Sequence, residues 1–349
     1  MTSVASRVSK AERKAWAREA FLGAECSLLP SFKPGSLELD EEGIRHDVRQ
    51  GIRQGFFSMF CAGVGLVGDE RRRFVEIATD EAGDSILIST GGGSRASVED
   101  GIEYLRQAEV LGCSHVMFGL PSGPAAKTED ELFSFSRQII ESSDLGIVLY
   151  AQSGERFKHL HPSNVPINVF RRLAELPNVV GVKITQVLDA VSTFEVCEQL
   201  GEKLLLGPVN LELLPLAARV APIQCTMMWQ VDACQSPEKP FVVDYLKLLA
   251  QHRIDDAVGV YRQMEPLVRL FWDEQAAVLR NGGHPWEHLK YHSWCVGANG
   301  GPLRQSDATH ALPPLTPDDR RLIRDTYANC GITPRDPDQE FDAGRVNFA

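Results

Sequence analysis

The chain has 349 residues, of which 43% are hydrophobic and 24% charged, and its formal net charge is -11. These proportions are typical of a folded globular protein and exclude a disordered chain. Nucleic-acid phosphates are bound by clustered Lys and Arg, so the surplus of carboxylates argues against a nucleic-acid partner. We expect a folded enzyme or binding protein.

The N-terminal segment MTSVASRVSKAERKAW has no apolar run long enough for a signal peptide. The chain also lacks a run of roughly 18 apolar residues, the length that crosses a membrane. The eight cysteines are scattered without C-x-x-C pairs, which is typical of buried thiols rather than of disulfides or metal ligands. These features predict a cytoplasmic protein without a membrane partner.

From about residue 24 onward, short apolar runs alternate with longer amphipathic segments. The predicted strands are 24–29, 57–62, 85–90, 115–119, 146–151, 179–184, 203–206 and 223–228. The predicted helices between them include 70–84, 98–111, 129–143, 165–176 and 188–200. This alternation predicts a parallel sheet covered by helices, and eight units are enough for a closed barrel. An open doubly wound sheet is the alternative.

From about residue 237 the strand pattern stops. Helices are predicted over 241–252, 255–275, 285–296 and 317–328. The predicted fold is therefore α/β, a (β/α)8 TIM barrel with a C-terminal helical appendage. We expect an N-terminal extension over 1–23, the barrel over 24–236 and the helical region over 237–349.

The second strand is followed by a glycine-rich turn that spells G-x-G-x-x-G at Gly63, Gly65 and Gly68. In a dinucleotide-binding fold the next strand should end in an acid that binds the ribose, but 86–90 runs into three glycines instead. We therefore expect no nucleotide cofactor. In a barrel this loop faces the active site, and the N–H groups of Gly63, Val64 and Gly65 are predicted to hold an anionic group of the substrate.

A single lysine, Lys183, lies at the carboxyl end of the sixth strand among apolar residues. Burial disfavours the ammonium form, and a neutral amine can attack a carbonyl. The fifth strand ends in Tyr150, whose phenol could move the protons that imine chemistry requires. Alternatively, Lys183 pairs with a carboxylate or reaches solvent. The alternative for Tyr150 is a tyrosine at the edge of the core with its hydroxyl in water.

With Tyr150 followed by Leu176-Pro-Asn-Val-Val-Gly-Val-Lys183, the sequence resembles the pyruvate-dependent class I lyases typified by dihydrodipicolinate synthase and N-acetylneuraminate lyase. Further similar segments are LLPSF at 28–32, DERRRFVE at 69–76, STGGG at 89–93, GLP at 119–121 and GPLR at 301–304. The resemblance implies a cofactor-free barrel enzyme, usually a homotetramer. It also implies that Lys183 forms the Schiff base and that Tyr150 relays protons.

The sequence departs from this family at two loops. The family's second-strand loop reads Gly-Thr-Thr-Gly-Glu, so here the N–H groups after the second strand, with Ser89 and Thr90, are expected to hold the substrate carboxylate. The tyrosines of the synthases after the fourth strand are replaced by PSGP at 121–124, which argues against synthase activity. The run YAQSGERFK at 150–158 is more similar to hydratase-aldolases that cleave aryl-substituted pyruvate adducts.

Other residues near the strand ends are candidate substrate contacts. Thr185 follows Lys183, and Met227 and Trp229 follow the eighth strand. The last two are predicted to form an apolar wall, or alternatively belong to the core. The sequence HPWEH at 284–288 matches the H-x-x-E-H zinc pattern. A helix that begins at Pro285 would leave His284 outside it, so we expect no metal there.

These residues predict a carbon-carbon lyase that joins or cleaves pyruvate and a hydrophobic or aromatic aldehyde. Within the same scaffold, a dehydratase or a dihydrodipicolinate-synthase-like enzyme is the alternative. A barrel that binds a 2-oxo acid without catalysis is an alternative of another class, and a metal-dependent lyase that uses His284 and His288 is a third.

Overall fold

The computed structural model describes residues 8–92, 96–121, 126–152, 154–185, 189–227, 231–280, 284–304 and 313–348, with only the backbone over 275–280. Its strands are β1 Gly23–Leu28, β2 Ser58–Cys61, β3 Leu87–Gly92, β4 His115–Phe118, β5 Gly146–Ala151, β6 Val179–Ile184, β7 Leu205–Pro208 and β8 Cys225–Met227.

The eight strands form one sheet in the order β7-β6-β5-β4-β3-β2-β1-β8. Strand β1 pairs with β8 in parallel, with Glu25 opposite Met227. The strand order follows the chain and brings the first strand beside the last, whereas a doubly wound sheet reverses its order at an internal point. The predicted (β/α)8 barrel with C-terminal helices is therefore confirmed.

The helices are α1 Arg13–Ala20, α2 Glu41–Arg53, α3 Glu70–Ala82, α4 Val98–Val110, α5 Glu129–Glu141, α6 Ile167–Leu173, α7 Ala190–Leu200, α8 Leu214–Val220, α9 Phe241–Ala250, α10 Ile254–Arg280, α11 Trp286–Cys295, α12 Pro317–Asn329 and α13 Asp338–Ala343. The side chains of Ser97, Thr128, Asp189 and Thr316 accept N–H bonds at the starts of α4, α5, α7 and α12. These caps explain why those helices begin close to the predicted residues.

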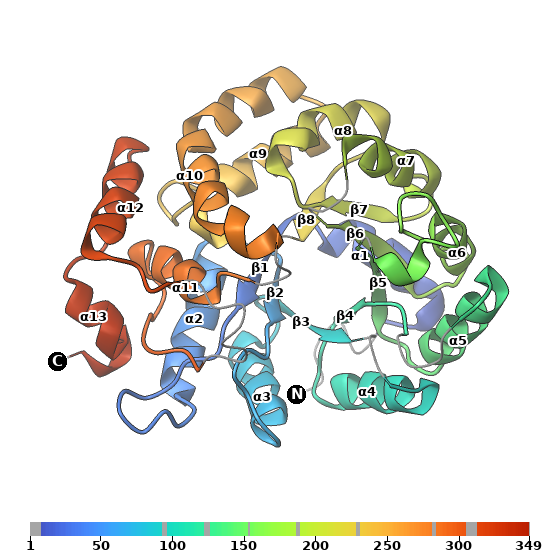
Figure 1. Ribbon diagram of the computed structural model, residues 1–349, viewed down its shortest axis with the longest axis horizontal. Coiled ribbons are helices and arrows are strands. Elements are labelled where there is room, and N and C mark those ends of the chain that lie inside the picture. Colours follow the sequence, from blue (N-terminus) through green and yellow to red (C-terminus); the bar gives the residue numbers. More distant parts are fainter. Residues whose placement is uncertain are drawn as a thin grey trace. The chain divides into compact units, whose positions relative to one another are not determined.

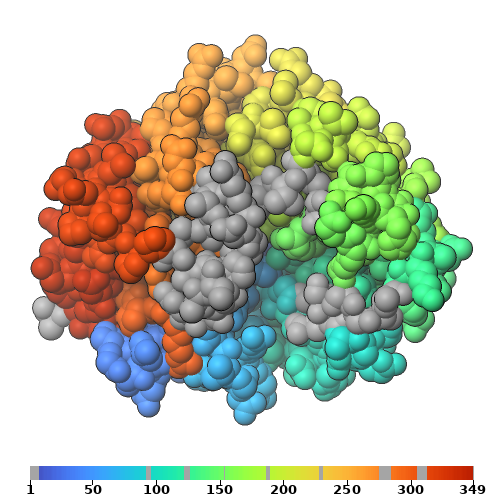
Figure 2. All heavy atoms as spheres, in the orientation of Figure 1, coloured from blue at the N-terminus to red at the C-terminus, as the bar shows by residue number. Residues whose placement is uncertain are grey.

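The chain divides into two compact units. The first consists of Met1–Glu25, Leu87–Met228 and Leu246–Ala257. In this unit α4 to α8 lie outside β3 to β7, and α4 and α5 are neighbours on its surface (Figures 1 and 2). Strands β5 and β6 are buried almost throughout, as parallel strands covered on both faces are.

The N-terminal helix α1 belongs to the first unit and packs on β5 and β6. Just after it, the Phe21 ring lies 4.6 Å from the His115 ring, measured between centroids. The Gln224 amide donates to the carbonyls of Arg18 and Phe21. These ring and amide contacts hold the end of α1 on the strands.

The second unit consists of Cys26–Ile86, Trp229–Tyr245 and Val258–Ala349. Here α2 and α3 pack beside β2 (Figure 1). A hydrophobic cluster joins the segments after β1 and β2 to α10 and α11; it consists of Leu29, Ala62, Val64, Ala233, Phe271 and Leu289. The domain boundaries expected from the sequence stay a prediction.

Within the described ranges, no helix is long and apolar enough to cross a membrane. The cysteines are free thiols, and all except Cys330 are buried. Burial raises the pKa of Cys113, Cys197 and Cys225 to about 12, so these thiols stay protonated at neutral pH.

Candidate active site

Lys183 lies near the carboxyl end of β6, in the first unit. Its side chain is 8% exposed. Burial lowers its pKa to about 8, and the charge of Glu25 acts in the opposite direction. The amine lies over the Tyr150 ring. It has the protonation behaviour that nucleophilic attack requires.

Tyr150 is the direct neighbour of Lys183 across the β5–β6 ladder. The ladder register shifts between Ile147 and Val148, so that Val180 of β6 is bypassed and Tyr150 comes opposite Lys183. The Lys183 Nζ lies 5.4 Å from the centroid of the Tyr150 ring. The structure thus brings together the amine and the phenol that the sequence singled out.

Thr185 follows β6 and is buried beside this pair. Burial raises the pKa of Tyr150, and the Thr185 hydroxyl acts to lower it. This effect arises from a hydrogen-bond contact between the Thr185 hydroxyl and the phenol, although the geometry of that contact is poor. A buried hydroxyl that is poorly satisfied can gain a better partner from a substrate oxygen.

Gly207 on β7 is the other ladder neighbour of Lys183. A methyl group added at Gly207 would lie 3.4 Å from Cγ of Met227. Met227 is 2% exposed and belongs to β8. Its thioether therefore fills the space that the glycine leaves beside Lys183, whereas Trp229 lies outside the described residues.

A buried polar cluster, which sequence reasoning missed, connects β1, β3 and β4. The Glu25 Oε1 accepts a hydrogen bond of 2.6 Å from Ser89 Oγ and lies 2.9 Å from His115 Nε2. The His115 Nδ1 lies 2.8 Å from Ser114 Oγ. Two signals pointed to this cluster: Glu25 interrupts an apolar strand, and His115 begins another.

The two hydroxyl residues of β3 face opposite sides of the strand. Ser89 is fully buried and bonds Glu25, as described above. Thr90 Oγ1 lies 2.7 Å from the hydroxyl of Tyr104 on α4, and that hydroxyl donates to the Gly91 carbonyl. Both serine and threonine thus have protein partners, and their predicted contact with a substrate carboxylate stays a prediction.

The loop after β5 holds the loop after β4. The Arg156 guanidinium donates to the carbonyls of Leu120 and Pro121, at 2.8 and 3.1 Å. It also lies over the Phe157 ring, 4.4 Å from its centroid. The rest of the PSGP segment lies outside the described residues.

Gly63, Val64 and Gly65 follow β2 and belong to the second unit. Val64 is part of that unit's hydrophobic cluster. Gly65 has φ +68°, and a methyl group there would lie 2.4 Å from the Arg304 carbonyl oxygen. This close backbone approach explains the glycine. The role of these N–H groups in binding a carboxylate stays a prediction.

The HPWEH motif also lies in the second unit. Helix α11 begins at Trp286, after Pro285, so His284 precedes it. The His288 Nε2 lies 3.0 Å from the Pro313 carbonyl oxygen. The His292 ring lies between Glu274 and the Tyr327 hydroxyl. Among the residues that the structure describes, no group of three His, Cys, Asp or Glu side chains is arranged to hold a metal.

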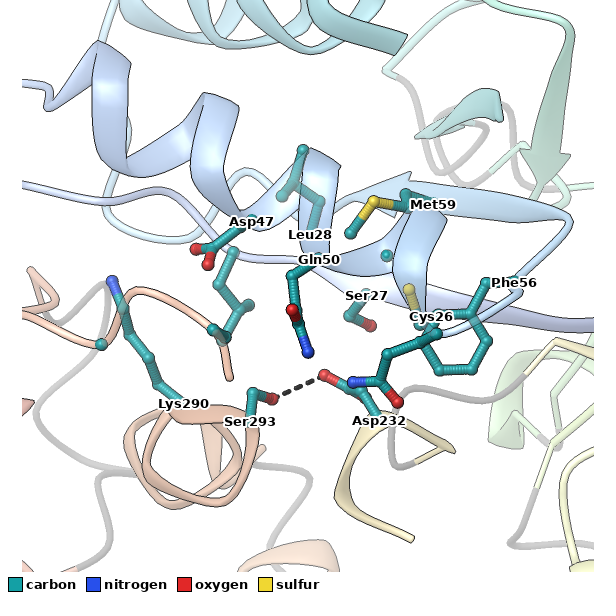
Figure 3. Close-up of a pocket in the computed structure, with 15 residues that line it drawn as sticks. Cys26, Ser27, Leu28, Asp47, Gln50, Phe56, Met59, Asp232, Lys290 and Ser293 are labelled. Atoms are coloured by element: carbon teal, nitrogen blue, oxygen red, sulfur yellow. Dashed lines mark hydrogen bonds between the residues drawn. The ribbon is translucent and has the colours of Figure 1, made fainter. Parts of the chain in front are cut away.

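The second unit contains a small cavity of about 40 Å³ (Figure 3). The Ser293 hydroxyl donates to Asp232 at 2.7 Å. Lys290 and Asp47 lie on the same side of the cavity (Figure 3). Burial raises the pKa of Asp232 to about 7. Burial also lowers the pKa of Lys290 to about 8, opposed by the charges of Asp47 and Asp40.

The fold and the buried amine define a class of protein: a (β/α)8 barrel with a lysine of lowered pKa at the carboxyl end of β6. A model of the dihydrodipicolinate synthetase family matches residues 26–206, more than half of the chain. The chain belongs to this family, and the resemblance noted in its sequence is confirmed.

The curated relatives include 4-hydroxy-tetrahydrodipicolinate synthases. That of Thermotoga petrophila is 29% identical over 168 residues, which are 47% of this chain and 54% of the relative. That of Methanothrix thermoacetophila is 25% identical over 315 residues, 87% of this chain and 95% of the relative. The chain thus spans about half the length of the Thermotoga relative that it matches.

Solved structures share the fold. The dihydrodipicolinate synthase of Thermotoga maritima has a TM-score of 0.70 at 20% identity, over 89% of this chain and 99% of its own. The N-acetylneuraminate lyase of Fusobacterium nucleatum, complexed with pyruvate, has a TM-score of 0.68 at 16% identity, over 88% of this chain and 96% of its own.

Proposed function

We propose that the protein is a class I lyase in which Lys183 forms a Schiff base with a 2-oxo acid, pyruvate being the acid released or consumed. The observation that supports this most is the buried Lys183 amine, with a pKa of about 8, beside the Tyr150 phenol. Membership of the family, and the pyruvate complex of the Fusobacterium nucleatum lyase, are in accord with it.

The proposed reaction needs no added oxidant or reductant. The neutral Lys183 amine attacks C2 of the 2-oxo acid, and the resulting carbinolamine loses water to give an iminium. The bond between C3 and C4 then breaks, and its electron pair passes into the iminium to form an enamine. The C4 hydroxyl loses its proton, so C4 leaves as an aldehyde. Protonation at C3 and hydrolysis release pyruvate and regenerate the amine.

Tyr150 is the proposed proton carrier for these steps. Because burial raises the pKa of Tyr150, the phenol is protonated at neutral pH and can donate to the hydroxyl that leaves the carbinolamine. The resulting phenolate can then accept the C4 hydroxyl proton. Thr185, whose buried hydroxyl lies beside the Tyr150 phenol, is proposed to bond a substrate oxygen.

We further propose a hydrophobic or aromatic aldehyde as the second product. Gly207 lies beside Lys183, and the Met227 thioether that occupies the space next to this glycine is apolar. An apolar side chain at this position favours a substrate with an apolar group beyond C4. The finer assignment as a hydratase-aldolase, which would also add water to an unsaturated precursor, rests on the sequence of residues 150–158 alone. A homotetramer is proposed on the family resemblance.

The second candidate is the synthase reaction, in which the enamine of pyruvate attacks aspartate semialdehyde. The names of the curated relatives favour it. Product analysis with pyruvate and each aldehyde separates the two candidates.

The test is reductive trapping. Pyruvate and borohydride should add mass to the protein, and peptide mapping should locate the adduct at Lys183. Lys183→Arg should abolish the adduct and retain the fold, because guanidinium stays protonated and is not a nucleophile. Absence of an adduct, or an adduct confined to another lysine, would contradict the proposal.

A further inference from the structure

The buried Glu25 carboxylate lies inside the first unit, among residues of non-adjacent strands. Glu25 belongs to β1, yet its hydrogen-bond partners Ser89 and His115 belong to β3 and β4. In the sheet order, β2 lies between β1 and β3. Side chains of non-adjacent strands meet in the interior of a barrel, so the Glu25 side chain points inward rather than toward the outer face.

This carboxylate is held in position by its two partners. Glu25 is 4% exposed, Ser89 is fully buried and His115 is 1% exposed. An ionised carboxylate buried to this degree is stabilised only where donors or cations face it. The Ser89 hydroxyl donates to Oε1 at 2.6 Å, and His115 Nε2 lies at 2.9 Å from the same oxygen. The Ser114 hydroxyl beside Nδ1 fixes the orientation of the ring.

Glu25 lies opposite Met227 in the β1–β8 ladder, Met227 lies against Gly207, and Gly207 lies opposite Lys183 in the β6–β7 ladder. The charge of Glu25 therefore reaches two further groups of these strands. It acts on Lys183 by favouring the ammonium form, and on Cys225 of β8 by favouring the neutral thiol. Lys183 is buried, and its own neighbour across the ladder, Tyr150, is neutral at pH 7. Glu25 is therefore the anion that acts on the Lys183 amine within the described part of the unit.

Other titratable groups lie on elements packed against β6 but face elsewhere. On α1, Arg13 faces Asp144 and Glu109, and Lys14 faces Glu175. On α7, burial keeps the Cys197 thiol protonated. None of these acts on Lys183 as Glu25 does.

We propose that Glu25, held by Ser89 and His115, is a positioning residue that supplies the buried countercharge for the Lys183 amine and for the iminium that it forms. This inference rests on the proposed Schiff-base function. An iminium is a fixed cation in a site that excludes water, so a preorganised anion stabilises it relative to the neutral ketone and amine. The same anion raises the pKa of the free Lys183 amine.

Glu25→Gln tests the charge at constant size, because the amide oxygen can still accept from Ser89 and His115. Ser89→Ala is the second variant; it keeps the carboxylate but removes one donor that stabilises its charge. Glu103→Gln is the matched control, since Glu103 is an exposed acid of the same unit that pairs with Arg106. Circular dichroism establishes that each variant is folded.

Two measurements separate this inference from the proposed function. The first is the pH dependence of acetylation of Lys183 by acetic anhydride, followed by mass spectrometry, which requires no pyruvate chemistry. Glu25→Gln should move the midpoint of the acetylation–pH profile to lower pH by about one unit. Ser89→Ala should move this midpoint by less, and the Glu103→Gln control should leave it unchanged. The second is the fraction trapped by pyruvate and borohydride above both midpoints, which should fall several-fold in Glu25→Gln.

An unchanged acetylation midpoint in folded Glu25→Gln and Ser89→Ala would overturn the inference, whether or not pyruvate is trapped. A shifted midpoint without any pyruvate adduct in the native protein would support the countercharge and overturn the Schiff-base function. A loss of thermal stability in these variants, with the acetylation midpoint and the trapped fraction unchanged, would show a purely structural role and also overturn the inference.

Discussion

Tyr150 and Lys183 are paired residues of adjacent parallel strands, and the Lys183 Nζ lies 5.4 Å from the centroid of the Tyr150 ring. The shift in ladder register two residues before Tyr150 makes them neighbours. A phenol at this position can exchange protons with groups that form on the lysine.

Replacement of Tyr150 by Phe removes that phenol without a change in ring packing. Turnover should fall by roughly 10²–10⁴-fold, the range for loss of a general acid–base. Imine trapping should persist at a reduced rate, because the Lys183 nucleophile remains. Steady-state kinetics and borohydride trapping check the two parts. Unchanged turnover would remove Tyr150 from the mechanism.

The rate of imine formation should depend on pH through Lys183. Burial lowers the pKa of this amine from 10.5 to about 8, so its neutral fraction rises as the pH rises toward 8 and then levels off. Below the midpoint, trapping by pyruvate and borohydride should accelerate roughly tenfold for each pH unit. The initial trapping rate between about pH 6 and 9.5 checks this. A rate that still rises steeply above pH 8 would indicate an ordinary, solvent-exposed lysine.

The aldehyde preference follows from the apolar surroundings of Gly207 and Met227. Each buried methylene of a substrate contributes about 0.8 kcal/mol, so an aromatic group can favour binding strongly over a polar group of similar length. In the condensation direction, aromatic aldehydes should give a higher kcat/KM than glyceraldehyde, N-acetylmannosamine or aspartate semialdehyde. A polar aldehyde that is better by tenfold would favour the synthase or sugar-acid reaction and leave the Schiff-base chemistry intact.

The cavity of the second unit should make stability depend on pH through Asp232. Burial raises its folded-state pKa from 3.8 to about 7, so between these values the unfolded chain loses a proton that the folded chain keeps. Its contribution to stability is therefore present below pH 3.8 and is lost as the pH rises to about 7. Asp232→Asn should flatten this part of the stability–pH profile, measured by urea unfolding, whereas the exposed Asp255→Asn should not. Parallel profiles for both variants would contradict the assignment.

Gly65→Ala should destabilise the second unit more than Gly68→Ala. Both glycines have positive φ, which costs an alanine about 1–2 kcal/mol. Only at Gly65 would the added methyl group also meet a backbone atom, the Arg304 carbonyl oxygen at 2.4 Å, whereas nothing lies within 4 Å at Gly68. Thermal melts of the two variants check the difference. Equal melting temperatures would mean that Arg304 shifts freely.

Much of the architecture was readable from the chain alone, because parallel strands covered by helices leave continuous apolar runs separated by amphipathic segments. Strands β5 and β6 have the predicted bounds, and most other elements differ by one or two residues at their ends. Lys183 and Tyr150 were identifiable for the same reason. A charged or phenolic side chain at the end of an apolar run stands out from its neighbours.

The tertiary structure alone decided which polar residues meet. Ser89 and His115 lie 64 and 90 residues from Glu25 in the sequence, and no local periodicity connects them. Thr90 and Ser89 are adjacent in the chain, yet one bonds α4 and the other the buried carboxylate. The physical reason is that strand alternation fixes the side to which a residue points, whereas sheet closure fixes which distant strand it faces.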